Sequence, residues 1–414
     1  MDVTLAALIG LIALALLFDF TNGFHDSANA IATVVATHVL RPRVAVAWAA
    51  FFNFAALLIV GTAVANTVGQ TVKTEYFGLP VVFAALLGAV IWNYLSWWLA
   101  LPTSSSHALV GALVGAGLAR GGPDAIHGGS VQKTALFILI SPVAGLLIGG
   151  AVMLVLRLLL RRADVVRTER RFRYAQLVSS AAVSLAHGGN NAQKTMGVVA
   201  ALLVATGHLE ASGDQLTIPL WVEVSAYTAI ALGTVSGGWR IIRTMGTRIT
   251  QLRPVSGFAA ETGAAVALFG STYLGAPVSS THTVAGAIAG AGSQNRAATV
   301  NWSIFGRVAL AWLVTMPVAA ALAALVYWGA TLPPEPYNVV LMGLVLLVLG
   351  TLLVVALRRA PSADEIEDEI TGDHEAPLRA GTGSLTGTAR VPLTSPEPDP
   401  DRARAVAKEI EQPL

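Results

Sequence analysis

Long apolar stretches alternate with short polar or basic connections along the first 357 residues of the chain. Apolar stretches of about 18 or more residues are typical of transmembrane helices. We expect eleven spans, at residues 3–38, 44–66, 78–100, 103–119, 134–158, 174–206, 218–238, 256–275, 278–292, 302–330 and 337–357. The pattern therefore predicts an all-α polytopic membrane protein.

Two of these spans, 3–38 and 174–206, are longer than a bilayer requires. A straight helix rises about 1.5 Å per residue and crosses about 30 Å of hydrocarbon with about 20 residues. Both spans also carry polar residues in the middle. We expect both to be broken helices, because unwound backbone inside a membrane is found where it lines a binding site.

The composition excludes an ordinary soluble domain. Hydrophobic residues make up 54% of the chain and charged residues 12%, whereas soluble domains carry about 25% charged residues. The segment 360–414 holds 12 acidic and 5 basic residues, so we expect a disordered acidic tail. The chain has no cysteine, which excludes disulfides and Cys-ligated metals. We expect a lipid bilayer around the body and no nucleic-acid partner.

Basic residues gather in alternate connections, which marks those connections as cytoplasmic. The strongest group lies at 157–173, a second at 240–253, and pairs lie at 41–43 and 358–359. The intervening connections at 207–217 and 331–338 contain no Lys or Arg. We therefore expect a protein of the plasma membrane, with its N-terminus outside and its tail in the cytoplasm.

One stretch occurs twice, as PTSSSHALVGALVGAG from Pro102 and as PVSSTHTVAGAIAGAG from Pro277, with 9 of 16 positions identical. In the expected topology the copies start near opposite faces of the membrane. Inverted repeats with a site near the midplane are typical of secondary transporters. We expect a first repeat at 1–160, a basic cytoplasmic linker at 161–173, a second, inverted repeat at 174–330, a last span within 331–359 and the tail at 360–414.

Each copy places a proline and then Ser or Thr residues at the start of a helix. Hydroxyl groups, free backbone N–H groups and the helix dipole together form a site for an anion. Two such ends would surround an oxyanion with uncharged donors, which allows its release. The candidate substrate ligands are Ser104, Ser105, Ser106, Ser279, Ser280 and Thr281. The alternative is that these hydroxyls only cap two helices.

The two long spans carry a second pair of motifs, NGFHDSANAIATVVA from Asn22 and HGGNNAQKTMGVVAA from His187. Asp26 in the first motif and Glu261 in a later span are ionisable groups within predicted spans. Such groups are costly in a membrane and are therefore functional candidates. A buried carboxylate takes up a proton, because burial disfavours its charged form, or it helps to bind Na⁺.

Other ionisable residues within spans have less specific explanations. Asp19 and Glu223 are best explained as hydrated groups near an interface, and Lys194 either binds an anion or pairs with Asp26. The four histidines of the motifs lie in separate spans without the spacing of a metal site: His25, His107, His187 and His282. We therefore expect no bound metal and no cofactor.

Two other classes of membrane protein fit less well. An intramembrane serine hydrolase needs Ser and His face to face, whereas SSSH places them at adjacent helix positions, and no GxSxG elbow occurs. A passive anion channel gives no reason for buried carboxylates. Neither an enzyme nor a channel is expected.

Both motif pairs resemble the signatures of the inorganic phosphate transporter (Pit) family. NGFHDSANAIATVV resembles the first signature, HGGNNAQKTMG resembles its second copy, and IPLWV, TMG and SGFAAE precede PVSSTH in the family's order. The resemblance covers nearly all of 1–357. It implies phosphate transport with H⁺ or Na⁺, in bacterial members often as a neutral metal–phosphate complex. It implies a substrate site that also includes Asn29, Asn190 and Gln193, and ion coupling through Asp26, Glu261 and the Asn191 position.

The sequence departs from that family at the coupling positions. Asn191 stands where the family usually has Asp, and Asn53 lies where sodium-dependent animal relatives have Glu. Both departures favour H⁺ coupling, with Na⁺ coupling as the alternative. Sulfate is a second alternative substrate, but it cannot donate a hydrogen bond to acceptors such as Asp26, whereas HPO₄²⁻ can. The resemblance leaves a homodimer open.

Overall fold

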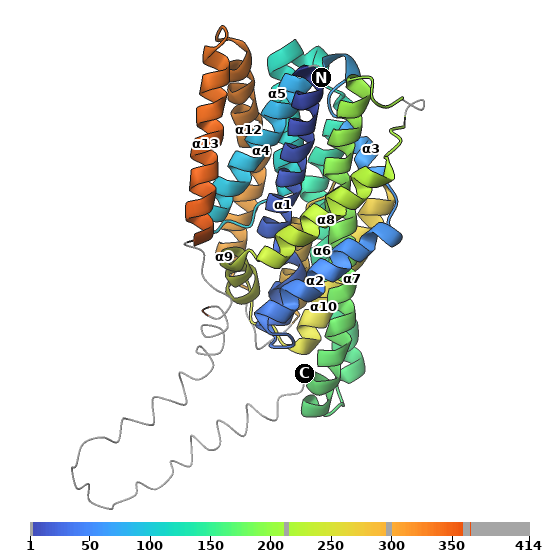
Figure 1. Cartoon of the computed structure of the whole chain (residues 1–414). Helices are drawn as coiled ribbons and strands as arrows, with labels where there is room; N and C mark the ends of the chain where they lie inside the picture. The colour runs from blue at the N-terminus through green and yellow to red at the C-terminus, as the bar shows by residue number, and fades with distance from the viewer. Residues whose placement is uncertain (1–2, 211–214, 295–299, 359–364, 366–414) are drawn as a thin grey trace, which may run out of the picture.

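The computed structural model describes residues 3–210, 215–294, 300–358 and 365, so the expected tail lies outside the described residues except for Glu365. Within these ranges the chain is a bundle of α-helices without a strand (Figure 1). The helices are α1 (Val3–Ala36), α2 (Pro42–Ala55), α3 (Ala63–Gly69), α4 (Leu79–Trp98), α5 (Ser105–Gly121), α6 (Gly128–Leu160), α7 (Val165–Ala205), α8 (Leu220–Ser236), α9 (Trp239–Arg243), α10 (Pro254–Tyr273), α11 (Ser280–Ser293), α12 (Trp302–Thr331) and α13 (Tyr337–Arg358). The all-α polytopic fold is as predicted.

The helices follow the predicted spans, with one difference at 44–66. That segment is two helices, Pro42–Leu58 with its final 3₁₀ turn and Ala63–Gly69, bent by 90°. By length and composition, four described helical segments could cross a membrane on their own: Leu5–Ala36, Leu79–Trp98, Gly128–Leu160 and Trp302–Thr331. The bent pair would give a fifth. α5 and α8, with 17 residues each, are at the lower limit of a full span, and α11, with 14 residues, is shorter than one.

The prediction that the first and sixth spans are broken is wrong. α1 and α7 are continuous helices of 34 and 41 residues. Their central polar side chains bind side chains of neighbouring helices, so the backbone can keep its own hydrogen bonds. The first turns of α7 lie in the predicted linker 161–173, where Val166, Arg170 and Arg171 are exposed.

Two helical hairpins, α4–α5 and α10–α11, meet at their connecting segments. Ser106 Oγ donates a hydrogen bond of 3.1 Å to the carbonyl oxygen of Val278, and Thr281 Oγ1 donates one of 3.0 Å to that of Thr103. The starts of α5 and α11 are therefore next to each other. We call residues 99–104 and 274–279 the hairpin tips.

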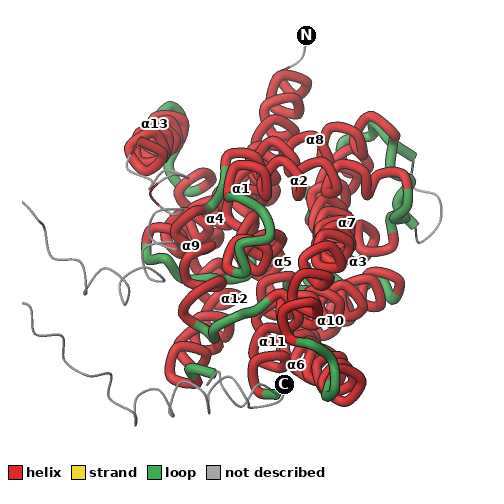
Figure 2. Tube along the Cα trace, turned by 90° about the horizontal axis from the view of Figure 1, so that it is seen from below, coloured by secondary structure: helices red, strands yellow, loops and turns green. Residues whose placement is uncertain are grey.

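From the hairpin tips, α5 and α11 run to different parts of the molecule. The last turns of α5 contact Val72 and Ile126, near Gly117, whereas those of α11 contact Thr250, near Gly292. α12 packs along α5, and α6 packs along α11. α13 lies at the edge of the bundle, against α12 and α4 (Figures 1 and 2).

Glycines allow these long helices to approach closely. A Cβ atom at Gly115 would lie 2.0 Å from the carbonyl oxygen of Ala320 in α12, and one at Gly290 would lie 2.1 Å from that of Leu146 in α6. Small residues spaced four apart are typical of close helix contacts in membranes. The glycines of the repeated motif therefore serve packing.

Two of the predicted basic connections and the end of α11 share one end of the bundle. Arg173 donates a hydrogen bond to the carbonyl oxygen of His38, and Arg157 Nη1 donates one of 3.0 Å to that of Gln294. The connections after α1, α6 and α11 therefore lie at the same end. The N-terminus of α1 lies at the other end (Figure 1).

Candidate substrate and coupling site

Two buried side chains of α1 contact the Ser/Thr-rich starts of α5 and α11. Ser105 Oγ donates to Asp26 Oδ1 at 3.1 Å. Asn29, one turn further along α1, donates from Nδ2 to Ser280 Oγ at 3.2 Å and to Thr281 Oγ1 at 2.9 Å. All five side chains are at most 2% exposed, so they form a polar cluster inside the bundle.

α7 completes this polar cluster from the opposite side. Asn191 Nδ2 donates to Asp26 Oδ2 at 3.3 Å and to Ser280 Oγ at 3.4 Å. Lys194 Nζ donates to Ser106 Oγ, to Asn191 Oδ1 and, at 3.1 Å, to the carbonyl oxygen of Val278. Three acceptors match the three N–H groups of an ammonium ion. We call these eight residues the central cluster: Asp26 and Asn29 of α1, Ser105 and Ser106 of α5, Asn191 and Lys194 of α7, and Ser280 and Thr281 of α11.

Several contacts of the central cluster come in matched pairs. Aligned positions of the two motifs differ by 165 residues between α1 and α7, and by 175 between α5 and α11. The contact of Asp26 with Ser105 matches that of Asn191 with Ser280. The contact of Asn29 with Thr281 matches that of Lys194 with Ser106. The hydrogen bond from Ser106 to Val278 and the one from Thr281 to Thr103 match each other in the same way.

The first serine of each copy has a different role. Ser104 Oγ and Ser279 Oγ accept the backbone N–H groups of His107 and His282, at 3.2 Å each. These two residues are helix caps, which is the role that the alternative interpretation gave to all the hydroxyl groups of the motif. The two hydroxyl residues after each cap lie in the central cluster.

Two predicted substrate ligands do not join the central cluster. Asn190 Nδ2 donates to Thr272 Oγ1 at 2.9 Å, and Gln193 Oε1 accepts the backbone N–H of Val64 at 2.8 Å. Both are fully buried. Their hydrogen bonds fasten α7 to α10 and to α3.

Glu261 lies in a second polar cluster, nearer the basic end of α1. Its carboxylate accepts from Thr33 Oγ1 and Ser179 Oγ, at 2.5 Å each, and from Gln176 Nε2 at 3.0 Å. It is 2% exposed. Thr33 is one turn beyond Asn29 on α1, so the helix connects this cluster to the central one.

Lys194, for which the sequence left open binding an anion or pairing with Asp26, lies in the central cluster, and His25, which was not a predicted site residue, contacts it. His25 Nδ1 is 2.8 Å from Asp26 Oδ1, and its Nε2 is 3.2 Å from Ser96 Oγ of α4. Lys194 follows Asn191 by three residues, which puts both on one helix face. That spacing favours the site over a purely structural role for Lys194. The Ser/Thr motifs predicted uncharged donors, and Lys194 adds an ammonium group to them.

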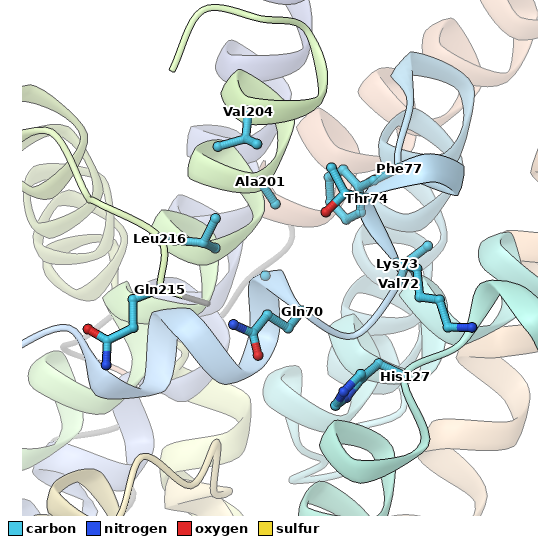
Figure 3. Close-up of a pocket in the computed structure, with 11 residues that line it drawn as sticks. Gln70, Val72, Lys73, Thr74, Phe77, His127, Ala201, Val204, Gln215 and Leu216 are labelled. Atoms are coloured by element: carbon cyan, nitrogen blue, oxygen red, sulfur yellow. The ribbon is translucent and has the colours of Figure 1, made fainter. Parts of the chain in front are cut away.

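A cavity of about 480 Å³ opens at the end of the bundle opposite the basic connections. Figure 3 shows Lys73 and His127 on one side of it and Gln215 on the other. Ala201 of α7 also lines it, about two helical turns beyond Lys194. None of the predicted site residues lines this cavity.

The central cluster has the chemistry of an oxyanion site. Hydroxyl groups, amide N–H groups and one ammonium converge where two helices begin, and helix N-termini favour negative charge. The described residues contain no group of three or more His, Asp or Glu side chains that could hold a metal ion. A buried polar site where two short helices begin inside an apolar bundle is typical of membrane transporters, and we assign the protein to that class.

Comparison with known proteins gives the family. The phosphate transporter family (PHO4) matches residues 22–323, and the chain belongs to this family. A probable low-affinity inorganic phosphate transporter of Rhizobium meliloti (strain 1021) is 50% identical over 80% of this chain and 99% of its own length. A protein of the same description from Bacillus subtilis (strain 168) is 39% identical over 79% and 98%.

A solved structure described as the sodium-dependent phosphate transporter has the same fold. It has a TM-score of 0.70 and 25% identity, covering 80% of this chain and all of that one. The chain is therefore a membrane-embedded phosphate transporter and not an enzyme.

Proposed function

We propose that this transporter imports phosphate by H⁺ symport and binds the anion in the central cluster. The proposed substrate ligands are Asn29, Ser105, Ser106, Ser280, Thr281 and Lys194. The observation that carries the proposal is the chain of hydrogen bonds from Asp26 through Asn191 to Lys194. One acid and one base thereby share a buried site.

The charges of this pair give a reason for coupling. With Asp26 ionised and Lys194 charged, the central cluster is neutral and offers little attraction to an anion. When a proton binds to Asp26, the central cluster keeps the positive charge of Lys194, and this charge attracts the monoanion H₂PO₄⁻. Because charge is costly inside the bilayer, anion and proton are expected to enter together.

Glu261 is proposed as a second coupling group. Its three hydrogen-bond donors lie on α1 and α7, the helices that also carry Asp26 and Asn191. Protonation at Glu261 would therefore alter contacts of both helices that hold the substrate.

The matched contacts support an arrangement of two inverted repeats, 1–160 and 174–330, joined by the linker 161–173 and followed by a last span within 331–359. Gly23 of α1 packs against Ile230 of α8, and Gly188 of α7, its partner in the motif alignment, packs against Asn53 of α2. We further propose that the protein lies in the plasma membrane, with the N-terminus outside and the tail 360–414 in the cytoplasm.

Phosphate uptake into proteoliposomes tests the proposal. An inward pH gradient without Na⁺ should drive accumulation of labelled phosphate above the external concentration. A Na⁺ gradient at equal pH should not. Uptake that needs Na⁺ and ignores the pH gradient would overturn H⁺ coupling.

Na⁺ coupling is the second candidate, because the solved relative is described as sodium-dependent. The variant Asn191→Asp tests it by restoring the carboxylate usual in the family. If the missing acid is what excludes Na⁺, the variant should gain uptake stimulated by Na⁺, and Asn191→Ser should not. Transport of a metal–phosphate complex and a homodimeric assembly stay predictions.

A further inference from the structure

α1 carries a polar face that extends beyond the central cluster. Five of its buried polar residues lie three or four positions apart, at Asp19, Asn22, Asp26, Asn29 and Thr33. That spacing puts them on one side of the helix. The proposed function uses Asp26, Asn29 and the Thr33 contact with Glu261, and leaves Asp19 and Asn22 without a role.

Asp19 is fully enclosed, with 0% exposure, so it is not a hydrated residue near an interface. Oδ1 accepts one hydrogen bond, from Thr195 Oγ1 of α7 at 2.6 Å, and Oδ2 has no partner among the described residues. Both side-chain polar atoms of the fully buried Asn22 also lack partners there.

The charged and titratable groups near Asp19 leave it without a direct ion pair in the described structure. On α7, Lys194 is the nearest positive charge, but its N–H groups are directed to the central cluster. On α8, Tyr227 is buried with its hydroxyl unpaired, and Glu223 is half-buried. On α4 the titratable side chain is Tyr94, near the C-terminal end of that helix. On α2 the charged side chain is Arg43, toward the end of the bundle that carries the basic connections.

An ionised carboxylate in such a place is expensive, because one hydroxyl donor does not replace its water. A protonated carboxyl needs one acceptor for its O–H group. Asn22 Oδ1, three residues on along the same helix face, is an unpaired acceptor. The enclosure therefore suits Asp19 in its protonated form.

We propose that Asp19 is a further proton-binding residue of the transport cycle, on the N-terminal side of the central cluster. In the proposed orientation it is the first buried carboxylate that a proton from outside meets. Thr195, which binds Asp19, is the neighbour of Lys194, which binds the central cluster. One turn of α7 thus contacts both sites, so protonation at Asp19 and anion binding act on the same backbone.

The inference rests on the proposed H⁺ symport and is tested by stoichiometry. In proteoliposomes with the membrane potential clamped at zero, the logarithm of the accumulation of H₂PO₄⁻, calculated from total phosphate and the pH on each side, is plotted against the imposed pH difference. The slope reports the protons carried with each H₂PO₄⁻. For Asp19→Asn the slope should fall by about one, while phosphate exchange at equal pH stays within about twofold. Glu223→Gln, which removes a half-buried acid from α8, should leave the slope unchanged.

Each outcome decides. An unchanged slope in Asp19→Asn overturns the inference. If Asp19→Asn also loses phosphate exchange, the variant Asp19→Glu is measured as well. Recovery of exchange with the wild-type slope supports a proton-binding carboxylate at this position. If exchange does not recover, Asp19 has a structural role and the inference is overturned. A wild-type protein with a slope of zero is a separate result, since it rejects the proposed H⁺ symport itself.

Discussion

Neighbouring residues of one motif have different roles because a helix turns about 100° per residue. Asn190 binds α10, whereas Asn191 binds Asp26 in the central cluster. The motif alone named both as site residues, and no local signal in the sequence separates them. The family resemblance implied Asn29, and the repeated motif indicated the hydroxyl residues after each cap, so both could be named as candidates before their partners were known.

Asp26 is the proposed coupling carboxylate, and its removal should separate coupling from binding. Asp26→Asn keeps the size of the side chain and cannot take up a proton. We expect accumulation driven by a pH gradient to fall to background, while exchange of internal for external phosphate continues. The measurement is uptake and counterflow of labelled phosphate in the same proteoliposomes. Concentrative uptake by the variant would contradict the assignment.

Lys194 is the one described cation in the central cluster. Lys194→Met keeps much of the stem and removes the charge, so the KM for phosphate should rise by at least about tenfold, which corresponds to about 1.4 kcal/mol of binding. Arg120→Gln, at an exposed position at the end of α5, is the control and should leave the KM unchanged. A normal KM in Lys194→Met would place the anion elsewhere.

At the scale of elements, long apolar stretches predicted most helices, although α6 and α7 begin earlier than expected and the segment 44–66 is two helices. The error in α1 and α7 has a clear cause: polar residues inside an apolar span were interpreted as a break. In α1 those residues instead find partners on α5, α7 and α11, and the helix stays intact. The sequence cannot reveal such partners, because they lie on helices about 80 to 250 residues away.

The contact of α5 with α12 gives a prediction about stability. Gly115→Ala would place a methyl group 2.0 Å from the carbonyl oxygen of Ala320, so the helices must separate. We expect a cost of about 1–3 kcal/mol, as for other overpacked sites, and a melting temperature in detergent several degrees lower. Gly270→Ala in α10 is the matched control, since no atom lies within 4 Å of its Cβ position. Equal melting temperatures for both variants would contradict the close packing.

At the scale of the whole molecule, orientation can be tested because the chain has no cysteine. Lys73→Cys, beside the cavity of Figure 3, should react in intact cells with a maleimide that cannot cross membranes. Arg162→Cys, in the exposed connection between α6 and α7, should react only after permeabilisation. The reverse pattern would place the N-terminus in the cytoplasm.

Each hairpin tip accepts one hydrogen bond from the start of the other hairpin's second helix, and the two hydrogen bonds occupy equivalent positions in the repeat. This equivalence fits a reversible carrier, in which the prevailing gradients decide the direction of net transport. With the proposed H⁺ symport, a starved cell whose proton gradient collapses would lose stored phosphate through the same protein that collected it. Such a cell would need to limit the number of copies in its membrane when energy is scarce.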